Sequence, residues 1–343
     1  MNTQILPIED PGKDESYVRR AAEILRAGGL VIIPTETVYG LAANALDGSA
    51  VRRIYEAKGR PSDNPLIVHV SNMEMIPPLV EDFPDGARRL AEAYWPGPLT
   101  IIVRKSGRIP QETSGGLDTV AIRMPSHPVA RAIIETAGIP LAAPSANLSG
   151  KPSPTNARRC IEDMMGRVDA IVDSGNCQVG VESTVITLAE GKPRLLRPGG
   201  ITLEQLEAVL GQVEVDPAVL HKLSAGAKAS SPGMKYKHYA PKAHVILVEG
   251  SLQQFAEYVK THQQGKTAAL CFDGEEAFLS VRAFSYGKKE DAATQAARLF
   301  DKLRELDDAG EETVYARCPD KEGVGLAVYN RLIRAAGFEV IKL

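Results

Sequence analysis

The sequence predicts an α/β protein, with a mixed and largely buried sheet followed by a second, smaller α/β domain. Two observations lead to this fold class. Short runs of Val, Ile and Leu, typical of buried strands, alternate with amphipathic helical segments up to residue 210, and the alternation starts again near residue 244. Some neighbouring strands have no helix between them, so we expect a mixed sheet and not a purely parallel one.

The elements of the first domain follow from apolar spacing and from chain-breaking residues. Val18, Ala21, Ala22 and Leu25 share one helical face, and Gly28-Gly29 ends this helix. A short buried strand, residues 30–33, is closed by Pro34. We expect further helices at 51–57, 85–94, 127–137 and 202–210, and further strands at 66–70, 99–103, 120–123, 141–143, 170–172 and 184–188.

The chain changes character after residue 211. Residues 221–242 contain five Lys, no Asp or Glu and no amphipathic period, which is the composition of a linker. We therefore predict a first domain at 1–212, a basic linker or lid at 213–243 and a C-terminal domain at 244–343. The last domain has predicted strands at 245–248, 268–272, 314–316 and 340–341 and helices at 251–263, 290–306 and 324–336, which indicates a small, doubly wound, Rossmann-like fold.

Charge and cysteine content narrow the classes of function. Lys and Arg number 40 and Asp and Glu 43, a net charge of −3, so any phosphate chemistry requires a local basic site. Four scattered cysteines without a C-x-x-C pair argue against a zinc site or a disulfide framework. The polar start of the chain lacks a signal-peptide pattern and no apolar run is long enough to cross a bilayer, so we expect a cytoplasmic protein without membrane contact.

Polar motifs stand at several predicted strand ends, where α/β sheets place ligand-binding residues. The segment TETVYG, residues 35–40, follows the first strand directly. Lys58 and Arg60, in KGRP, can converge on one polyphosphate, although such a pair is more often simply solvated. His69 lies in an apolar strand, where a packed, hydrogen-bonded histidine is the usual case and a ligand role the rarer one.

Two later strands end in groups suited to anions. Arg123 closes a buried strand before Pro125, so its guanidinium has to reach solvent or pair with an anion such as a carboxylate. Ser145 and Asn147, in PSANLSG, can offer a hydroxyl and an amide to phosphate oxygens, although a plain Ser/Asn-rich turn is the commoner explanation. The Walker A, G-x-G-x-x-G, H-E-x-x-H and G-x-S-x-G signatures are all absent.

Taken in order, the motifs resemble the YrdC-like family of threonylcarbamoyl-AMP synthases. The resemblance rests on PTETVYGL at 34–41, KGRP at 58–61, PLIVHV at 65–70, WPGPLT at 95–100, AIRMP at 121–125 and PSANLSG at 144–150. The later segments ESTV, LRPG and SPGMKYKHYAP, with a further domain behind them, are similar to the long, two-domain form of the family. The fold implied is a twisted, YrdC-like mixed sheet with helices plus a small Rossmann-like domain.

The resemblance implies a nucleotidyltransferase. L-Threonine, bicarbonate (or CO2) and ATP would give L-threonylcarbamoyladenylate, pyrophosphate and water. A partner complex would then transfer the threonylcarbamoyl group to an adenosine beside the anticodon of tRNA, with at most a weak RNA contact by this chain. Mg2+ is expected with ATP, held largely by phosphates and water, so no protein metal ligand is expected. No protein nucleophile is needed, because the site has mainly to align three reactants and neutralise charge on the departing pyrophosphate.

The resemblance also assigns site residues. The family's Lys-x-Arg and Ser-x-Asn pairs fall on Lys58, Arg60, Ser145 and Asn147, which are assigned to catalysis, to the triphosphate and to its metal. Further candidates for ATP are Asn64, Thr119, Ser153, Arg197 and Tyr236, the last as part of a lid over the site. Threonine is assigned to Thr37, His69, Arg123 (as the partner of its carboxylate), the backbone at Ala143, and Ser183. We expect Lys58 and Arg60 at the surface of the site.

Two other functions remain open. A carbamoyltransferase module of the hydrogenase-maturation type shares the YrdC-like domain, but those proteins carry acylphosphatase and Cys-rich zinc segments that four scattered cysteines do not supply. A double-stranded RNA-binding protein would bind RNA with a steep salt dependence and ignore threonine. The net charge of −3 counts against this second alternative.

Overall fold

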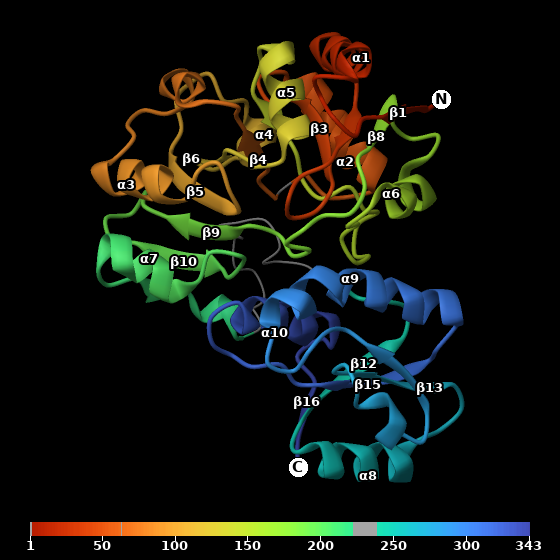
Figure 1. Cartoon of the computed structure of the whole chain (residues 1–343). Helices are drawn as coiled ribbons and strands as arrows, with labels where there is room; N and C mark the ends of the chain where they lie inside the picture. The colour runs from red at the N-terminus through yellow and green to blue at the C-terminus, as the bar shows by residue number, and fades with distance from the viewer. Residues whose placement is uncertain (1, 63, 222–238) are drawn as a thin grey trace.

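A computed structural model describes residues 2–62, 64–221 and 239–343 of the chain. Within these residues an 11-stranded sheet is followed by a 5-stranded sheet (Figure 1). The predicted α/β class and the mixed character of the first sheet are confirmed, because parallel and antiparallel neighbours both occur in it. Across the described part of the chain, no helix is both long and apolar enough to span a membrane.

The strands of the first sheet lie in the order β1-β8-β2-β3-β7-β4-β6-β5-β9-β10-β11. Strands β4 and β6 are parallel neighbours, and β7 runs antiparallel to β4, so the ends of β4 and β6 and the start of β7 meet at one edge. The strands are β1 (Gln4–Pro7), β2 (Val31–Ile33), β3 (Gly40–Asn44), β4 (Ile67–His69), β5 (Leu99–Arg104), β6 (Thr119–Arg123), β7 (Leu141–Ala142), β8 (Ala170–Asp173), β9 (Thr184–Thr187), β10 (Arg194–Arg197) and β11 (Glu214–Val215).

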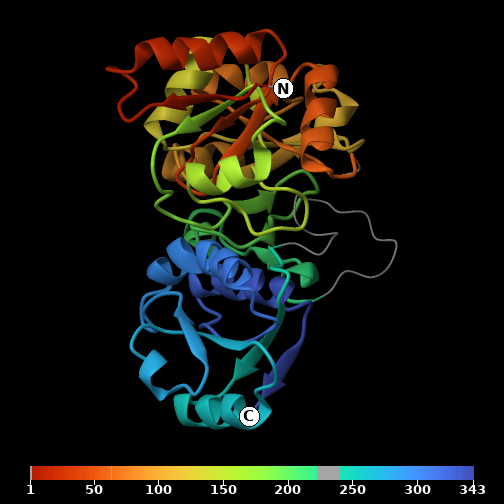
Figure 2. The same ribbon diagram turned by 90° about the vertical axis from the view of Figure 1, so that its right-hand side faces the viewer.

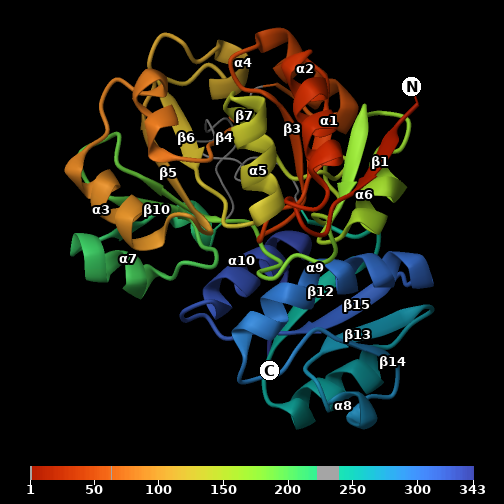
Figure 3. The ribbon, with the colours of Figure 1, turned by 45° about the horizontal axis from the view of Figure 1, so that its top comes forward.

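Helices cover both faces of this sheet. Helices α1 and α5 lie side by side on one face (Figure 3), and their apolar residues form one core with β1, β2 and β8. Residues of α2, α3 and α6 belong to a separate core. The helices of the first domain are α1 (Glu15–Arg26), α2 (Gly48–Lys58), α3 (Asp85–Tyr94), α4 (Gln111–Ser114), α5 (Pro128–Ala137), α6 (Ala157–Met164) and α7 (Leu203–Leu210), with short 3-10 turns at Met73–Met75, Pro77–Leu79 and Pro217–Val219.

Local signals at both ends of α2 fix the start of the KGRP motif. The Asp47 carboxylate caps the helix by accepting from the backbone N–H groups of Ser49 and Ala50. Gly59 ends the helix in the left-handed conformation, with φ of 61°, which a glycine adopts without strain. Lys58 is therefore the last helical residue, and Arg60 leaves the helix in a different direction.

The second sheet is parallel throughout, in the order β14-β13-β15-β12-β16. Alternate residues of β12 point to opposite faces: Val245 and Leu247 pack with α9 and α10, whereas Ile246 and Val248 pack with α8. This is the predicted doubly wound arrangement. Its elements are β12 (His244–Glu249), α8 (Leu252–His262), β13 (Thr267–Cys271), a 3-10 turn at Glu276–Phe278, β14 (Arg282–Ser285), α9 (Ala292–Ala309), β15 (Thr313–Arg317), α10 (Gly325–Ala335) and β16 (Val340–Lys342).

The two domains share an apolar core. Helices α9 and α10 lie between the two sheets (Figures 1 and 2), and their core extends to Val38, Val181 and Tyr239, which come from outside the second sheet and its helices. At Gly180 the first domain comes so close to α9 that an added Cβ would lie 2.5 Å from the carbonyl oxygen of Ala296. Glycine is required at this point of contact.

Several elements were not expected from the sequence, namely β1, β3, α4, α6, β10, β11 and β14. Two of them show why. Strand β3 consists of Gly, Leu, Ala and Asn, and β14 of Arg, Ala, Phe and Ser, so neither is rich in strand-forming residues. Both are strands because a neighbour supplies the hydrogen bonds, β2 in one case and β13 in the other.

The predicted linker, residues 213–243, includes β11, which pairs with β10 at the edge of the first sheet. Residues 222–238 lie outside the described residues. The predicted C-terminal domain starts at residue 244, where β12 begins. The three domain boundaries as such stay a prediction.

We predict that Gly180→Ala loosens the contact between the domains. Gly175 is the matched control, because its φ of 76° is close to the 78° of Gly180 while an added Cβ at Gly175 would meet no atom within 4 Å. Both variants carry the left-handed backbone penalty of about 1 kcal/mol. Urea unfolding should show an additional loss of about 2 kcal/mol for Gly180→Ala alone. Equal losses in the two variants would contradict the prediction.

Candidate active site

A cavity opens in the first domain. Its walls come from the residues that follow β2, α2 and β7, from the ends of β4, β6 and β10, from the residues before β9, and from the segment that precedes β12. The lining residues are Thr35, Thr37, Val38, Gly40, Arg60, Pro65, Leu66, Ile67, His69, Arg123, Ala143, Pro144, Ser145, Asn147, Glu182, Ser183, Arg197 and Tyr239. The structure therefore brings together nine of the residues that the sequence assigned to the site: Thr37, Arg60, His69, Arg123, Ala143, Ser145, Asn147, Ser183 and Arg197.

One wall is built around the guanidinium of Arg123. Its NH1 donates to Thr37 Oγ1 at 2.8 Å, and its NH2 lies 2.7 Å from Glu36 Oε1. Burial alone would raise the pKa of Glu36, but the charge and hydrogen bond of Arg123 lower it, so this carboxyl stays ionised. Each terminal nitrogen of Arg123 carries a second hydrogen, so the side chain can still donate to a carboxylate in the cavity.

His69 lies deep in the same wall and is 2% exposed. Its Nδ1 is 3.2 Å from the carbonyl oxygen of Ile67, and because a carbonyl only accepts, Nδ1 carries the hydrogen. Burial, together with the nearby charge of Arg123, lowers the pKa of His69 to about 3. The ring is therefore neutral near pH 7, and its Nε2 is a hydrogen-bond acceptor.

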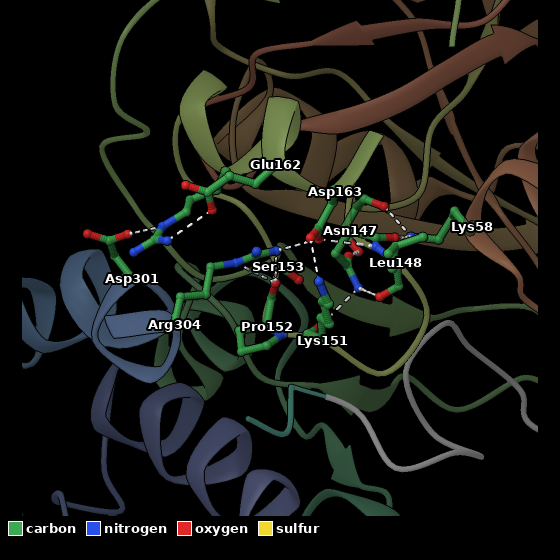
Figure 4. Close-up of polar contacts among 12 residues, drawn as sticks. Lys58, Asn147, Leu148, Lys151, Pro152, Ser153, Glu162, Asp163, Asp301 and Arg304 are labelled. Atoms are coloured by element: carbon green, nitrogen blue, oxygen red, sulfur yellow. Dashed lines mark hydrogen bonds and ion pairs between the residues drawn. The ribbon is translucent and has the colours of Figure 1, made fainter. Parts of the chain in front are cut away.

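Two further lining residues, Ser145 and Asn147, belong to the 145–153 loop (Figure 4). Ser145 Oγ donates to Asn147 Oδ1 at 2.6 Å, and Asn147 Nδ2 donates to the carbonyl oxygens of Leu148 and Lys151. The Nζ of Lys58 donates to the carbonyl oxygens of Ser145 and Asn147, the latter at 2.7 Å. The predicted Ser-x-Asn pair thus forms one hydrogen-bonded unit, with Lys58 behind it.

The expectation that Lys58 lies at the surface of the site is wrong. Lys58 is 3% exposed and is not among the residues that line the cavity. Burial, with a further contribution from the charge of Arg60, holds the pKa of Lys58 well below its usual range. The physical reason is that the loop carbonyls need a donor from inside the fold, and the last residue of α2 supplies it. Replacing Lys58 therefore removes a support of the loop.

Two arginines remain on the cavity side. Arg60 lines the cavity and its guanidinium lies 6.0 Å from the ring centre of Tyr55. Arg197 also lines it, and burial lowers the pKa of Arg197 to about 10, which leaves it charged at pH 7. Arg197 Nε donates to the carbonyl oxygen of Ser183 and its NH2 to the Ser183 hydroxyl. The net charge of −3 for the chain thus conceals a local basic site of the kind that the sequence required.

A carboxylate that sequence reasoning did not assign, Glu182, also lines the cavity. Its Oε1 accepts from Ser153 Oγ at 2.5 Å and its Oε2 from the Nε of Arg331 at 2.9 Å. Arg331 is fully buried and comes from α10 of the second domain. Burial would raise the pKa of Glu182, but the charges of Arg331 and Arg197 lower it. The second domain therefore compensates a negative charge at the wall of the cavity.

Besides Lys58, four assigned residues are not among those that line this cavity. Asn64 is fully buried next to the lining residue Pro65, and its side-chain amide makes no hydrogen bond within the described part of the chain. Ser153 lies behind Glu182, as its hydrogen bond shows. Thr119 starts β6, at the end opposite Arg123, and lines a separate surface hollow. Tyr236 lies outside the described residues.

Motifs noted in the sequence contain lining residues that were not assigned to the site. Tyr239 belongs to the SPGMKYKHYAP segment from which only Tyr236 was chosen, and it lines the cavity with φ of 63°. Thr35 and Glu182 lie in motifs that were noted without being assigned. No local sequence pattern indicates a role for Arg331, because only the packing of the two domains brings this residue to Glu182.

The carboxylates at the cavity do not form a metal site. Glu182 is paired with Arg331 and Glu36 with Arg123. No group of three or more His, Cys, Asp or Glu side chains within 2–62, 64–221 and 239–343 is arranged to hold a metal ion. Neutral oxygens remain available at Ser145 and Asn147, which suits a metal that arrives bound to a substrate.

Comparison with known proteins shows the family to which the chain belongs. A family model described as "Telomere recombination" matches residues 23–199, and one described as "Threonylcarbamoyl-AMP synthase, C-terminal domain" matches residues 201–337. The threonylcarbamoyl-AMP synthase of Pyrococcus abyssi is 47% identical over 336 residues, which cover 96% of this chain and 97% of that one. The chain belongs to the threonylcarbamoyl-AMP synthase family. The threonylcarbamoyl-AMP synthase of Bacillus subtilis is 45% identical over 333 residues, 96% of this chain and 95% of the other.

Solved structures match the whole fold. The structure named as P. abyssi Sua5 complexed with L-threonine has a TM-score of 0.93 at 44% identity and covers all of both chains. Shorter threonylcarbamoyl-AMP synthase relatives also occur: a putative one from Mycobacterium tuberculosis is 38% identical over 218 residues, which are 64% of this chain and 99% of that one. The predicted two-domain form of the family is thus confirmed.

We predict that His69 makes the stability of the protein depend on pH. Its folded pKa of about 3 lies below the unfolded value near 6.5, so between these values only the unfolded state binds a proton. Stability from this source is present above about pH 6.5 and is lost as the pH falls, by up to about 1.4 kcal/mol per pH unit. His69→Gln should remove that slope between about pH 6 and pH 5 in urea unfolding.

The exposed His221 supplies the control, because His221→Gln should leave the slope of the wild-type protein in place. If the wild-type protein and His69→Gln lose stability in parallel as the pH falls, the neutral state assigned to His69 is wrong.

Proposed function

We propose that the chain is a threonylcarbamoyl-AMP synthase, which joins L-threonine, bicarbonate (or CO2) and ATP into L-threonylcarbamoyladenylate and releases pyrophosphate and water. The observation that carries this proposal is the match over the full length of both chains to a structure named for its complex with L-threonine. The arrangement of the cavity supports it, since hydrogen-bonding groups suited to an amino acid and cations suited to a triphosphate line the same space.

The threonine end of the cavity is assigned to Thr37, His69, Arg123, Ser183 and the backbone at Ala143. Arg123 can donate to the carboxylate of threonine, and Glu36 behind it balances part of its charge. Neutral His69 offers Nε2 as an acceptor for the amine or the hydroxyl of threonine. A neutral acceptor suits this position because the amine has to be unprotonated when it attacks the one-carbon substrate.

The ATP end is assigned to Arg60, Arg197, Ser145 and Asn147. The two arginines provide positive charge where the pyrophosphate leaves, and in a cavity with little water this charge acts strongly. Lys58 contributes mainly by holding the carbonyl groups of Ser145 and Asn147, so that the hydroxyl and amide keep fixed positions. The assignments of Asn64, Thr119, Ser153 and Tyr236 to ATP remain proposals that lie outside the lining of the cavity.

The reaction depends more on the orientation of its substrates than on reactive groups of the protein. The threonine amine attacks the carbon of bicarbonate, which loses water (with CO2 instead, only a proton is lost), and this gives a carbamate. A carbamate oxygen then attacks the α-phosphorus of ATP, and the bond from that phosphorus to pyrophosphate breaks. Mg2+ bound to ATP would screen the phosphate charge, and the neutral oxygens of Ser145 and Asn147 are the lining groups that could contact it. The chain itself binds and orients the substrates and neutralises the charge of the departing pyrophosphate.

The product is an activated carbamoyl donor, and we propose that it serves the threonylcarbamoyl modification of tRNA through a separate transfer complex in the cytoplasm. A weak RNA contact by this chain is part of the same proposal. The absence of a candidate spanning helix in the described residues is compatible with this setting.

We predict that release of pyrophosphate from ATP requires both bicarbonate and L-threonine. Incubation with ATP, bicarbonate and one amino acid at a time, followed by a pyrophosphate assay and mass spectrometry of the adenylate, tests this. Threonine should exceed valine, which lacks the hydroxyl, by at least about a hundredfold, because buried polar partners would be left unpaired. Pyrophosphate release that does not need threonine would rule out the proposed function, and RNA binding that ignores threonine would favour the RNA-binding alternative.

We predict that Arg60→Ala lowers pyrophosphate release at least about a hundredfold, because a cation next to the leaving group is lost. Arg52→Ala is the control, since Arg52 lies on α2, the helix that ends just before Arg60, is half exposed and pairs with Glu112 away from the cavity. The steady-state rates of pyrophosphate release at saturating substrate concentrations test this prediction. Arg60→Ala turnover equal to that of Arg52→Ala would contradict the role assigned to Arg60.

A further inference from the structure

The 145–153 loop depends on a buried carboxylate beneath it. Asp163, on α6, is 4% exposed, and its Oδ1 accepts from Lys151 Nζ at 2.8 Å. Its Oδ2 accepts from the backbone N–H of Leu148 at 3.3 Å (Figure 4). Leu148 and Lys151 are the residues whose carbonyl oxygens accept from the Asn147 side chain. Asp163 therefore holds the loop next to Asn147, one of the residues that line the cavity.

The partner of Asp163 comes from the second domain. Arg304, in the middle of α9, donates from NH2 to Asp163 Oδ2 at 2.8 Å. The same guanidinium donates from Nε and NH2 to the carbonyl oxygen of Pro152, at 3.1 and 2.7 Å. Arg304 is only 6% exposed. One buried side chain of α9 thus reaches the loop directly at Pro152 and indirectly through Asp163.

The contact between Arg304 and Asp163 is electrostatic as well as steric. Burial alone would raise the pKa of Asp163, but the hydrogen bond and the charge of Arg304, followed by those of Lys151, lower it. If Arg304 is removed, the buried carboxylate loses its main counter-ion, a change that is strongly destabilising in general. Lys151 is 42% exposed at its side chain and cannot replace a buried partner fully.

We propose that Arg304 is a positioning residue for the triphosphate: through Asp163 and Pro152 the second domain sets the position of Ser145, Asn147 and Lys58, although Arg304 does not line the cavity. The inference rests on the proposed synthase function and on the assignment of the 145–153 loop to ATP. The path runs from Arg304 to Asp163, from Asp163 to Leu148, from Leu148 to Asn147, and from Asn147 to Lys58 (Figure 4).

A second ion-pair group between the same two helices makes the proposal specific. Arg159, on α6, donates to Asp301 and Asp308 of α9 at 3.0 and 2.8 Å. This group joins the domains as Arg304 does, but none of its hydrogen bonds described here reaches the 145–153 loop. Loss of domain contact and loss of loop position can therefore be separated by mutation.

The experiment uses full-length Arg304→Ala and Asp163→Asn, with Asp301→Asn/Asp308→Asn as the interface control. Initial rates of pyrophosphate release give KM for ATP and KM for threonine separately. Arg304→Ala should raise KM for ATP about tenfold or more, because a displaced loop misplaces the groups that bind phosphate. Its KM for threonine should change less than about twofold, since the threonine end does not include the loop. Asp163→Asn should act in the same direction, and the interface control should leave both constants within about twofold.

The inference is overturned if folded Arg304→Ala keeps the wild-type KM for ATP, if both KM values rise equally, or if the interface control raises KM for ATP as much as Arg304→Ala does. Should Arg304→Ala fail to fold, Arg304→Lys decides, because it keeps the charge and loses the planar set of donors. A selective rise in KM for ATP then supports the inference, and wild-type constants refute it. Failure of the proposed function would be seen separately, as the absence of threonine-dependent pyrophosphate release by the wild-type protein.

Discussion

The buried ion pair between Glu182 and Arg331 connects the two domains to the cavity. A carboxylate at the wall of a site for a polyanion would repel its ligand, and inside a protein it would also lack solvation. Arg331 provides the compensating charge from α10, and Ser153 provides a further hydrogen bond. The position of Glu182 then fixes the start of β9, and with it Ser183, whose hydroxyl contacts Thr100 and Arg197. Ser183, which lines the cavity, thus depends on a side chain about 150 residues further along the chain than Glu182.

The basic residues at and behind the cavity are held by contacts with the protein. Lys58 donates to the carbonyl oxygens of Ser145 and Asn147, and Arg123 contacts Thr37 and Glu36. Arg197 donates to the carbonyl oxygen and the hydroxyl of Ser183, and it lines the cavity together with Arg123 and Arg60. Because a buried charged group without a partner is strongly unfavourable, these contacts help to retain the basic residues in the fold before any substrate binds. The same residues keep the polar groups of the walls in place.

Much of the first domain could be predicted from the sequence because its signals are local. Apolar runs identify β2 and β4 to β6, the Gly28-Gly29 pair marks the end of α1, and motifs at strand ends locate Thr37, His69, Arg123 and Asn147. The rest could not be predicted for a physical reason. Strands β3 and β14 exist because of pairing with distant neighbours, and Lys58 is buried because a loop 90 residues away needs a donor. Arg304 and Arg331 belong to helices whose sequence shows only amphipathic spacing.

Arg304 and Arg331 of the second domain affect whether the first domain can be separated from the rest of the chain. Each of them supplies a buried counter-ion to an acid of the first domain, Arg304 to Asp163 and Arg331 to Glu182. The apolar core of α9 and α10 also includes Val38 and Val181. Cutting the chain in the 222–238 segment would therefore leave the first piece with two acids that have lost a buried counter-ion and with an uncovered apolar face. An engineered single-domain enzyme derived from this sequence would have to compensate for these losses at Asp163, at Glu182 and at the two valines that would become exposed.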